Sequence, residues 1–529
     1  MKRFIYIIFS LLPFVAVSQN MYNISDLFDN APSGTARFVS MGGSMGALGG
    51  DLSVMGVNPA GTAIYRSSDV NLSGVYGIVK NRSEYENSAI TSKFDGLDLS
   101  NIGLVLAYDL DDSPVKYLNF GVNFRRKANY NSNFEMAGAA NGFSQQYAID
   151  YMYWRNPFDI QNMNIQDMSK EMFRDFNYNW LALLAAGVDL YDDKGNFLLY
   201  PDDKSPDKYY LIHEPTRLGY YSETRGGLDV FDMNISANIN DRFYLGVTLG
   251  YYRLDYSRYS YYYETTDANG IYALENNYKL SGSGWDFKLG AIFRPFKYSP
   301  FKVAAFLHSP VLYKLTDSYS ASIDGPQPND DYFATESEDC YGDKVYVSYS
   351  LRTPWKFGAA MSYTFGNFLA VNAEYEYSDV ASTSFTEGND IDLAQNEEIS
   401  YNLKAQHTVR LGAEFSLNKL MKGAGFDKVS SSVRVGYNFV SSPFRNDAYK
   451  CMDNAVLVDT STEFVNKYSK NIFTAGFGMV IKSFYFDLAY MYQTQKSDFY
   501  PFYDMEFVNP AAKVKTTGHT IMAGVGIRF

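Results

Sequence analysis

The chain has 529 residues, of which 46% are hydrophobic and 17% are aromatic, with 47 Tyr and 39 Phe. Its 46 Lys and Arg stand against 59 Asp and Glu, and no basic block could follow a row of phosphates, which argues against nucleic acid as a partner. Two cysteines are too few for a disulfide scaffold or a thiolate metal site. The aromatic content is typical of the girdles of membrane β-barrels and exceeds what a soluble domain needs.

Residues 1–18 are expected to form a cleaved secretory signal. Lys2 and Arg3 are basic, residues 4–15 are almost wholly apolar, and small residues at 16–18 suit a signal peptidase. The apolar stretch is shorter than the roughly 18 to 20 residues of a spanning helix, and no second long apolar stretch follows. Helical membrane spans are therefore excluded.

Residues 19–68 do not alternate like a strand and are rich in small and apolar residues. A glycine-rich run covers residues 41–50, and Asn58, Pro59, Ala60 and Gly61 follow. Glycine allows close packing, and backbone away from the wall at membrane depth is tolerated where it is buried in protein. We therefore expect a plug inside a barrel. A phosphate-binding loop at residues 42–50 would need a Lys-Ser/Thr ending and a preceding strand, and both are missing.

From residue 69 to residue 529 the chain shows repeated period-2 alternation, which predicts an all-β, membrane-spanning antiparallel barrel of about 14 strands. The clearest strand sets Phe231, Met233 and Ile235 against polar neighbours, and the last one ends at Phe529. The expected strands are 69–80, 101–110, 117–127, 228–240, 243–255, 285–294, 301–309, 355–365, 367–377, 407–416, 432–440, 471–481, 484–494 and 518–529.

Short links alternate with long polar segments, as the periplasmic turns and external loops of outer-membrane barrels do. The long segments are 81–100, 128–227, 310–354 and 441–470, and 128–227 is the longest. This arrangement predicts an outer-membrane location with both chain ends on the periplasmic side. A soluble pair of β-sandwiches is the alternative, but it explains neither the signal nor the loop asymmetry.

The longest segment also contains an expected amphipathic helix. Its apolar residues recur at helical spacing and include Met168, Met172, Phe176 and Trp180. Such a helix could form a wall of an external capture groove for apolar ligands, or it could simply cover the core of its own loop. Both interpretations are open from sequence.

No metal site, cofactor or catalytic centre is expected. The acidic clusters lack calcium-loop spacing and suit solvated loops that contact lipopolysaccharide through divalent ions. Cys340 and Cys451 both fall in expected external segments, and the sequence does not decide whether they pair. Of the histidines, only His308 is expected to point inward at a strand, and no serine is singled out to accompany it. The chain is therefore not expected to be an enzyme.

The glycine-rich segment carries a specific resemblance. Residues 41–51, followed by residues 57–61, resemble the N-terminal hatch of the FadL/TodX family of outer-membrane hydrophobic-compound transporters. Residues 307–310, 353–358 and 409–412 resemble the Bacteroidetes-type branch. The resemblance implies a fourteen-stranded barrel plugged by its N-terminus. It also implies a lateral gap in the wall, with Asn58 to Ala60 near an inward kink of the third strand, here 117–127.

The expected function is passive uptake of hydrophobic small molecules, long-chain fatty acids or similar, through an apolar pocket, the hatch and a lateral opening. Pocket candidates are Phe38, Met41, Met45 and Leu48, and the hatch motif is Asn58 to Gly61. The partners would be that ligand, outer-membrane lipid and lipopolysaccharide, with the protein a monomer. The alternative is a barrel component or shuttle of a protein-secretion system. An aqueous porin is disfavoured by the apolar hatch, and a TonB-dependent barrel by its larger strand number.

Overall fold

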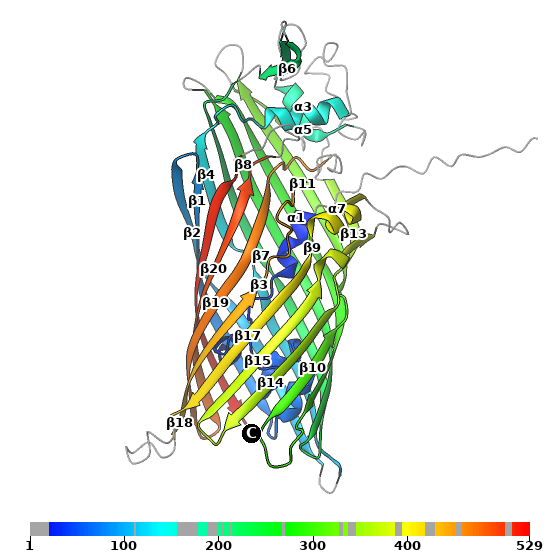
Figure 1. Cartoon of the computed structure of the whole chain (residues 1–529), viewed down its shortest axis with the longest axis vertical. Helices are drawn as coiled ribbons and strands as arrows, with labels where there is room; N and C mark the ends of the chain where they lie inside the picture. The colour runs from blue at the N-terminus through cyan, green and yellow to red at the C-terminus, as the bar shows by residue number, and fades with distance from the viewer. Residues whose placement is uncertain are drawn as a thin grey trace, which may run out of the picture.

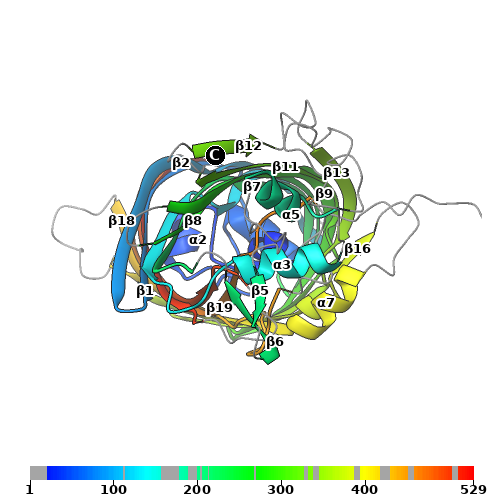
Figure 2. The same cartoon turned by 90° about the horizontal axis from the view of Figure 1, so that it is seen from above.

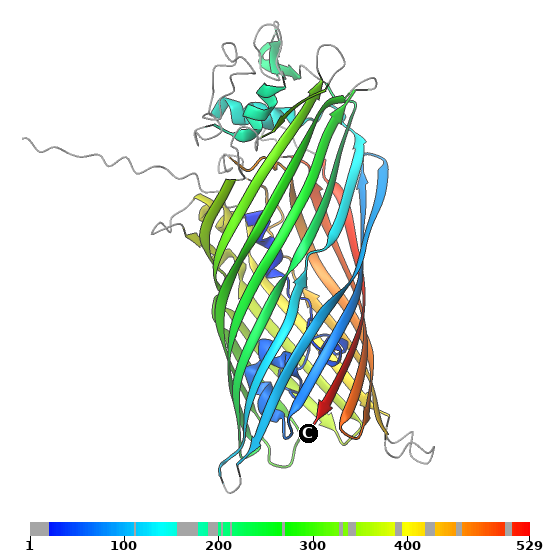
Figure 3. The same cartoon turned by 180° about the vertical axis from the view of Figure 1, so that it is seen from behind.

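The computed structural model describes residues 21–110, 113–155, 178–188, 199–202, 205–211, 214–266, 270–326, 332–336, 345–386, 394–417, 429–450, 458–502 and 510–529. These residues form a closed antiparallel barrel of 14 strands (Figures 1 and 3). The first strand, β1 (Asp69–Tyr85), closes the barrel by pairing with the last, β21 (Ala512–Arg528). The predicted fold class and strand number are confirmed.

Most wall strands are continuous, and four are built from two segments each. The continuous strands are β1, β2 (Ser88–Asp109), β7 (Arg217–Ile239), β8 (Phe243–Thr265), β9 (Gly270–Phe293), β17 (Ala405–Ser416), β18 (Val429–Val440), β19 (Phe464–Ile481), β20 (Phe484–Tyr500) and β21. The divided strands are β3 (Val115–Asn129) with β4 (Ser132–Ala139), β10 (Lys302–His308) with β11 (Leu312–Pro326), β14 (Lys356–Phe365) with β13 (Val345–Arg352), and β15 (Leu369–Asp379) with β16 (Ser384–Thr386). Outside the 14, β12 (Tyr332–Glu336) pairs antiparallel with the end of β11, and β5 (Leu199–Asp202) pairs with β6 (Ser205–Leu211).

The outer face of the wall is apolar and the inner face is polar. Along β7, Phe231, Met233 and Ile235 are exposed while Asp232 and Asn234 are buried, as the alternation predicts. Aromatic pairs mark two levels of the same ladder, Phe243 against Phe293 at the lower end and Tyr251 against Trp285 higher up. An apolar belt between aromatic girdles is what a lipid bilayer requires of a barrel, so the protein is an outer-membrane barrel.

Residues 81–100 are not a loop, contrary to the sequence-based expectation. β1 and β2 continue through them as a hairpin that closes at Glu86 and Asn87, both with positive φ, as a tight hairpin turn requires. Above the membrane both faces of a strand meet water, so the apolar alternation fades while the backbone ladder continues. For the same reason β7, β8 and β9 extend well beyond their predicted limits.

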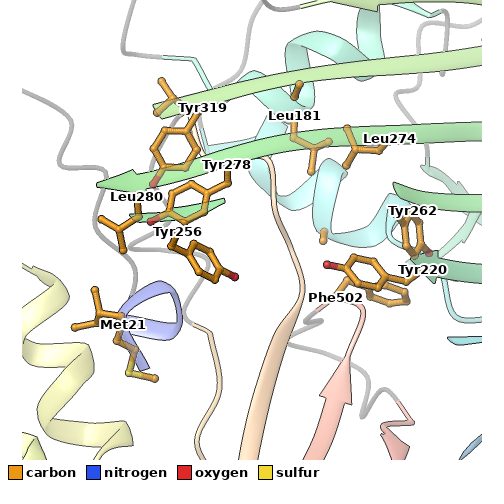
Figure 4. Close-up of a cluster of buried hydrophobic side chains, with 14 of the residues drawn as sticks. Met21, Leu181, Tyr220, Tyr256, Tyr262, Leu274, Tyr278, Leu280, Tyr319 and Phe502 are labelled. Carbon is orange, nitrogen blue, oxygen red and sulfur yellow. The ribbon is translucent and has the colours of Figure 1, made fainter. Parts of the chain in front are cut away.

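The two ends of the described chain lie at opposite ends of the barrel. Phe529 is at the end that carries the short turns, as predicted (Figure 1). Met21, by contrast, is buried in the upper half among residues of the external mouth, so the expected periplasmic position of this end is wrong (Figures 1 and 4). The chain therefore descends through the lumen before it enters β1.

Five short helices make up this luminal segment, which Figures 1 and 2 show in blue inside the barrel. They are α1 (Met21–Ile24), η1 (Ser25–Phe28), α2 (Ala36–Ser40), η2 (Leu52–Gly56) and η3 (Pro59–Ile64). Three begin with a capping side chain: Thr35 accepts from Phe38 N, Asp51 from Ser53 N and Asn58 from Ala60 N. These caps satisfy donors that helices this short would otherwise leave unpaired inside the barrel.

The external mouth is covered by α3 (Gln146–Arg155) and α5 (Trp180–Gly187), seen over the lumen in Figure 2. Leu181 of α5 packs in a cluster of buried tyrosines and aliphatic residues from β7, β8, β9 and β11, and Met21 belongs to the same cluster (Figure 4). The strand-connecting residues 458–463 are also buried, and Asp459 pairs with Lys450 at 3.3 Å. Burial alone would raise the pKa of Asp459, but Lys450 and a hydrogen bond from Ser461 outweigh it and lower the pKa. Among the described residues no helix has the length and apolarity of a membrane span.

Candidate functional site

The hatch motif is pressed directly onto the backbone of the wall. Gly246 of β8 and Gly290 of β9 face each other in the ladder, and the turn at Asn58 to Ala60 lies on this pair. A Cβ on Gly290 would stand 1.9 Å from Asn58 Oδ1, and one on Gly246 would stand 2.4 Å from Pro59 O. The Asn58 amide also donates to Gly46 O at 2.6 Å, which ties the motif to the glycine-rich run. Only glycine in the wall permits this contact.

A second glycine pair holds the other end of the hatch. Gly412 of β17 faces Gly436 of β18, and a Cβ on either would meet the backbone of Met41 or Gly42 at 2.5 Å or less. Ser44 Oγ then donates to the carbonyl of Asn372 on β15 at 3.1 Å. The hatch is therefore fixed to two separated parts of the wall by close backbone contact.

Asn58 to Ala60 do not face the third strand, contrary to the expectation from the resemblance. The part of the hatch that reaches β3 is η2 with the end of η3: Met55 packs over Gly121, Gly56 lies against the Arg125 guanidinium, and Asn119 donates to Thr62 O at 2.7 Å. The short η3 helix turns away from β8 and β9 towards β3 and so separates the two contacts.

Above the hatch lies a narrow cavity of about 70 Å³. Its floor is formed by Phe38, Gly56 and Val57, and one side by the luminal residues Leu27 to Ser33. The wall contributes residues from β3, β8, β9, β10, β11, β14, β15 and β17, with the links 309–311 and 353–354 and with Val380 of η5 (Val380–Ser382). Its lining combines apolar groups such as Phe28 and Val311 with charged groups, so it is less apolar than expected.

Most charges around the cavity are paired. Arg410 bonds to Glu374 at 2.7 Å and to Glu376 at 3.0 Å. Arg125 pairs with Asp232 at 3.1 Å, and Lys288 bridges Asp232 and Asp286 at 3.1 and 2.7 Å. Burial makes an unpaired charge costly, so removal of either partner of such a pair would destabilise the wall.

Lys127 of β3 is the exception. It lines the cavity, and its Nζ lies 5.7 Å from the centroid of the Tyr252 ring. Among the described residues no ion pair with a carboxylate involves it, although Lys356 on the opposite side pairs with Glu376 at 3.4 Å. The cavity thus presents one amine without a fixed counter-charge.

The upper part of the luminal segment, residues 21–33, packs its apolar residues into the mouth cluster and is also held by polar side chains. Asp26 pairs with Lys467, and Asp29 with Lys470 at 2.6 Å. Asn30 accepts from Lys356 Nζ at 2.6 Å and donates to Gln406 at 3.2 Å. No wall glycine seats this segment among the described residues.

Solved structures with a similar architecture show which fold this barrel has. A FadL homologue from Pseudomonas aeruginosa superposes with a TM-score of 0.51 at 11% identity, covering 94% of this chain and 99% of that one. The chain has the FadL fold. The P. putida toluene transporter TodX (TM-score 0.48, 9% identity, 94% and 99% covered) and the Ralstonia pickettii toluene transporter TbuX (0.46, 10%, 94% and 99%) are also similar. No protein-family model and no curated protein sequence matches the chain.

Within this FadL fold, one of the four predicted pocket residues reaches the cavity. Phe38 lines it. Met41 and Met45 are fully buried between hatch and wall with Phe306 and Met522, and Leu48 packs against the same cluster. Sequence reasoning chose them as apolar hatch residues, but seating on wall glycines turns them away from the open space.

The expected external capture helix is only partly described. Met168, Met172 and Phe176 lie outside the described residues, as do Cys340, Cys451 and the signal at 1–18. Trp180 begins α5 and is 2% exposed within the mouth cluster. This position matches a helix that covers its own loop core, and a capture role for the four residues stays a prediction.

Sequence reasoning missed the charged lining. Glu374, Glu376 and Arg410 occupy inward positions of strands that were predicted correctly, and Lys127 ends the predicted third strand. Charges at inward positions near the upper ends of strands were the available signal. His308 does point inward as predicted, and its Nε2 lies 2.6 Å from Val57 O. This contact assigns it to holding η2, and among the described residues no cluster of His, Cys, Asp or Glu is arranged to bind a metal.

Proposed function

We propose that this barrel takes up hydrophobic small molecules across the outer membrane by diffusion, and that its ligands carry a carboxylate, as long-chain fatty acids do. The observation that carries the proposal is the cavity above the hatch, where Lys127 stands beside Phe28, Leu27 and Val311. An apolar chain gains about 25 cal/mol for each Å² that it buries. A carboxylate would supply the counter-charge that Lys127 lacks.

The closed mouth supports uptake of apolar molecules over an aqueous pore. Helix α5 and residues 458–463 fill the external end with packed side chains, while the hatch fills the periplasmic half. Water-soluble solutes therefore meet two stoppers in series. An apolar molecule can reach the cavity from the membrane, which is the route that the FadL resemblance implies.

Ligand analysis by native mass spectrometry tests the proposal. We expect purified wild-type protein to retain a fatty acid or similar molecule, and a variant without residues 19–68 to lose it. Lys127→Met should bind a fatty acid about tenfold more weakly but leave the matching fatty alcohol unaffected, since only the charge-assisted bond is lost. Lys314→Met, at an exposed outer position of β11, is the matched control.

Two outcomes would contradict the proposal. Equal weakening of acid and alcohol by Lys127→Met would mean that Lys127 shapes the cavity without binding a carboxylate. Absence of any apolar ligand in all forms, with a protein co-purifying instead, would favour the secretion-shuttle function.

A further inference from the structure

Three neighbouring wall strands are interrupted at the same height. β10 gives way to β11 at residues 309–311, β14 to β13 at 353–355, and β15 to β16 at 380–383. The registers place the interruptions side by side, because His308 pairs with Lys356 below them and Leu312 with Arg352 above. Bulges and breaks confined to adjacent strands are a known way in which barrels re-aim side chains at a functional position.

The local sequence explains the interruptions. Pro310 and Pro354 have no backbone N–H to donate to a ladder, and η5 turns the chain out of the plane of the sheet after β15. At the first interruption one backbone bond remains, from Thr353 N to Val311 O at 3.1 Å, and Val311 N donates to Thr353 Oγ1 at 2.8 Å. Across the second, Ser378 Oγ donates to Trp355 O at 3.2 Å. Hydroxyl bonds of this kind open at lower cost than a continuous backbone ladder.

The gap is widest between β13/β14 and β15/β16. The ladder stops at Lys356 with Ser378 and resumes at Arg352 with Ser384, so residues 353–355 face residues 379–383. Within these described segments no backbone pair joins the two sides. Higher up, β16 does not pair with β17, and helix α7 (Ala394–Asn402) stands there, with Asn396 Oδ1 accepting from Phe385 N at 2.7 Å. We call the opening framed by residues 353–355, 378–384 and α7 the η5 window.

The cavity lies directly behind this window. Thr353, Pro354, Ser378 and Val380 all line it, together with Ser309 and Val311 of the neighbouring interruption. Val380 is 1% exposed and faces inward, so η5 is the segment that separates the cavity from the outside.

The third-strand region does not offer the cavity the same outlet. The β2–β3 ladder does end at Asn101, but no residue of β1, β2 or β4 lines the cavity. The seam there is also closed by side-chain bonds, because Ser83 Oγ donates to Glu135 O at 2.6 Å and Ser92 Oγ to Asn133 O at 3.0 Å.

On the outside, the window opens at the upper aromatic girdle. Trp355 is 37% exposed and packs edge-on against Phe287, with ring centroids 6.4 Å apart. Across the window, exposed Tyr375 bonds to His407 Nδ1 at 2.7 Å. Tyr, Trp and His side chains at this height mark the interface of the outer leaflet.

We propose that apolar ligands pass between the outer leaflet and the cavity through the η5 window, with η5 as the segment that moves aside. The inference rests on the proposed function and adds the route, which it places on the wall opposite Lys127 of β3 rather than at the third strand. A ligand that lies in the leaflet with its polar head at the girdle would meet Trp355 and the window at the same height.

Photolabelling locates the route. Outer-membrane vesicles that contain the full-length protein are incubated with a long-chain fatty acid that carries a diazirine at its tail, irradiated, and analysed by peptide mass spectrometry. We expect labels at residues 353–355 and 380–382 as well as at cavity residues such as Phe28. Labels in the cavity and at residues 98–101 or 129–133, with none at the window, would overturn the inference and leave the proposed function standing. No label inside the barrel would refute the proposed function itself.

Paired variants test the route by rate. Ser378→Ala removes the hydroxyl that bridges the window to Trp355 O, and uptake of a fluorescent fatty acid into vesicles should become about fivefold faster. Ser83→Ala with Ser92→Ala loosens the third-strand seam in the same way and should leave the rate unchanged. The reverse pattern would overturn the inference.

Heat-dependent gel mobility shows whether the loosened window impairs folding. If it does, a second variant still tests the route. Ala381→Trp adds bulk to η5 at a half-exposed position and should slow uptake severalfold while leaving retention of prebound fatty acid intact. An unchanged uptake rate in Ala381→Trp would count against the window.

Discussion

The lower and upper parts of the luminal segment are held in opposite ways. Residues 34–66 lie against the wall by backbone contact, with Asn58 to Ala60 on Gly246 and Gly290 and the Met41–Gly42 turn on Gly412 and Gly436. Residues 21–33 are held by apolar packing of their first turns in the mouth cluster, and by ion pairs and side-chain hydrogen bonds such as those of Asp29 and Asn30. Backbone-on-backbone contact tolerates no added atom, whereas ion pairs break and re-form at small cost.

The lower half of the plug is therefore the fixed stopper. The cavity lies between the two parts, with the rigid lower hatch as its floor and the polar upper segment as one side. A ligand that enters therefore displaces the upper segment more readily than the floor.

The largest effect is expected from a substitution at a wall glycine that seats residues 34–66. Gly290→Ala places a Cβ within 1.9 Å of Asn58 Oδ1 and 2.9 Å of Ala60 N, so the hatch turn must leave its seat. Overpacking of this kind costs about 1–3 kcal/mol. We expect faster protease cleavage within residues 34–66. Gly77→Ala is the control, since nothing lies within 4 Å of its Cβ, and equal behaviour of the two variants would refute the glycine seat.

A smaller effect is expected from the cap of η3. Asn58→Ala removes the acceptor for Ala60 N and the donor to Gly46 O, both buried. Loss of such a cap costs about 0.5–2 kcal/mol. Hatch proteolysis should accelerate less than in Gly290→Ala, while Asn129→Ala, at an exposed position, should match wild type. An Asn58→Ala hatch as resistant as wild type would mean that the motif acts only through its backbone.

The smallest effect is expected from the ion pairs that hold residues 21–33. Asp26→Asn with Asp29→Asn removes the pairs with Lys467 and Lys470, which are partly exposed and screened by salt. Each pair is worth about 0.2–1 kcal/mol at most. Hydrogen exchange of residues 21–33 should rise at low salt and differ little from wild type at high salt. A salt-independent rise, or one that spreads to residues 34–66, would show that the two parts are coupled.

Local patterns were sufficient for the wall. Alternation such as Phe231 to Ile235 against Asp232 and Asn234 reports which side of a strand meets lipid, and each strand carries that signal alone. The signal fades above the membrane, so alternation alone predicts a loop where the β1–β2 hairpin continues. The glycine-rich run and Asn58 to Gly61 likewise indicated a hatch, because tight packing leaves a trace in composition.

Contacts between distant segments had no local trace. These contacts form where the hatch meets strands that lie hundreds of residues away. They decide which glycines seat Asn58 and which lysine lacks a carboxylate partner. They also decide why Met41 and Met45 face the wall while Phe38 faces the cavity.

The sequence by itself thus determined an outer-membrane β-barrel with an N-terminal plug, since lipid and water impose a period of two on every strand. The tertiary structure alone decided where the plug sits, where the cavity lies and where three broken strands come side by side. Those properties depend on closure of the barrel, which sets the register of strands that share no local sequence pattern.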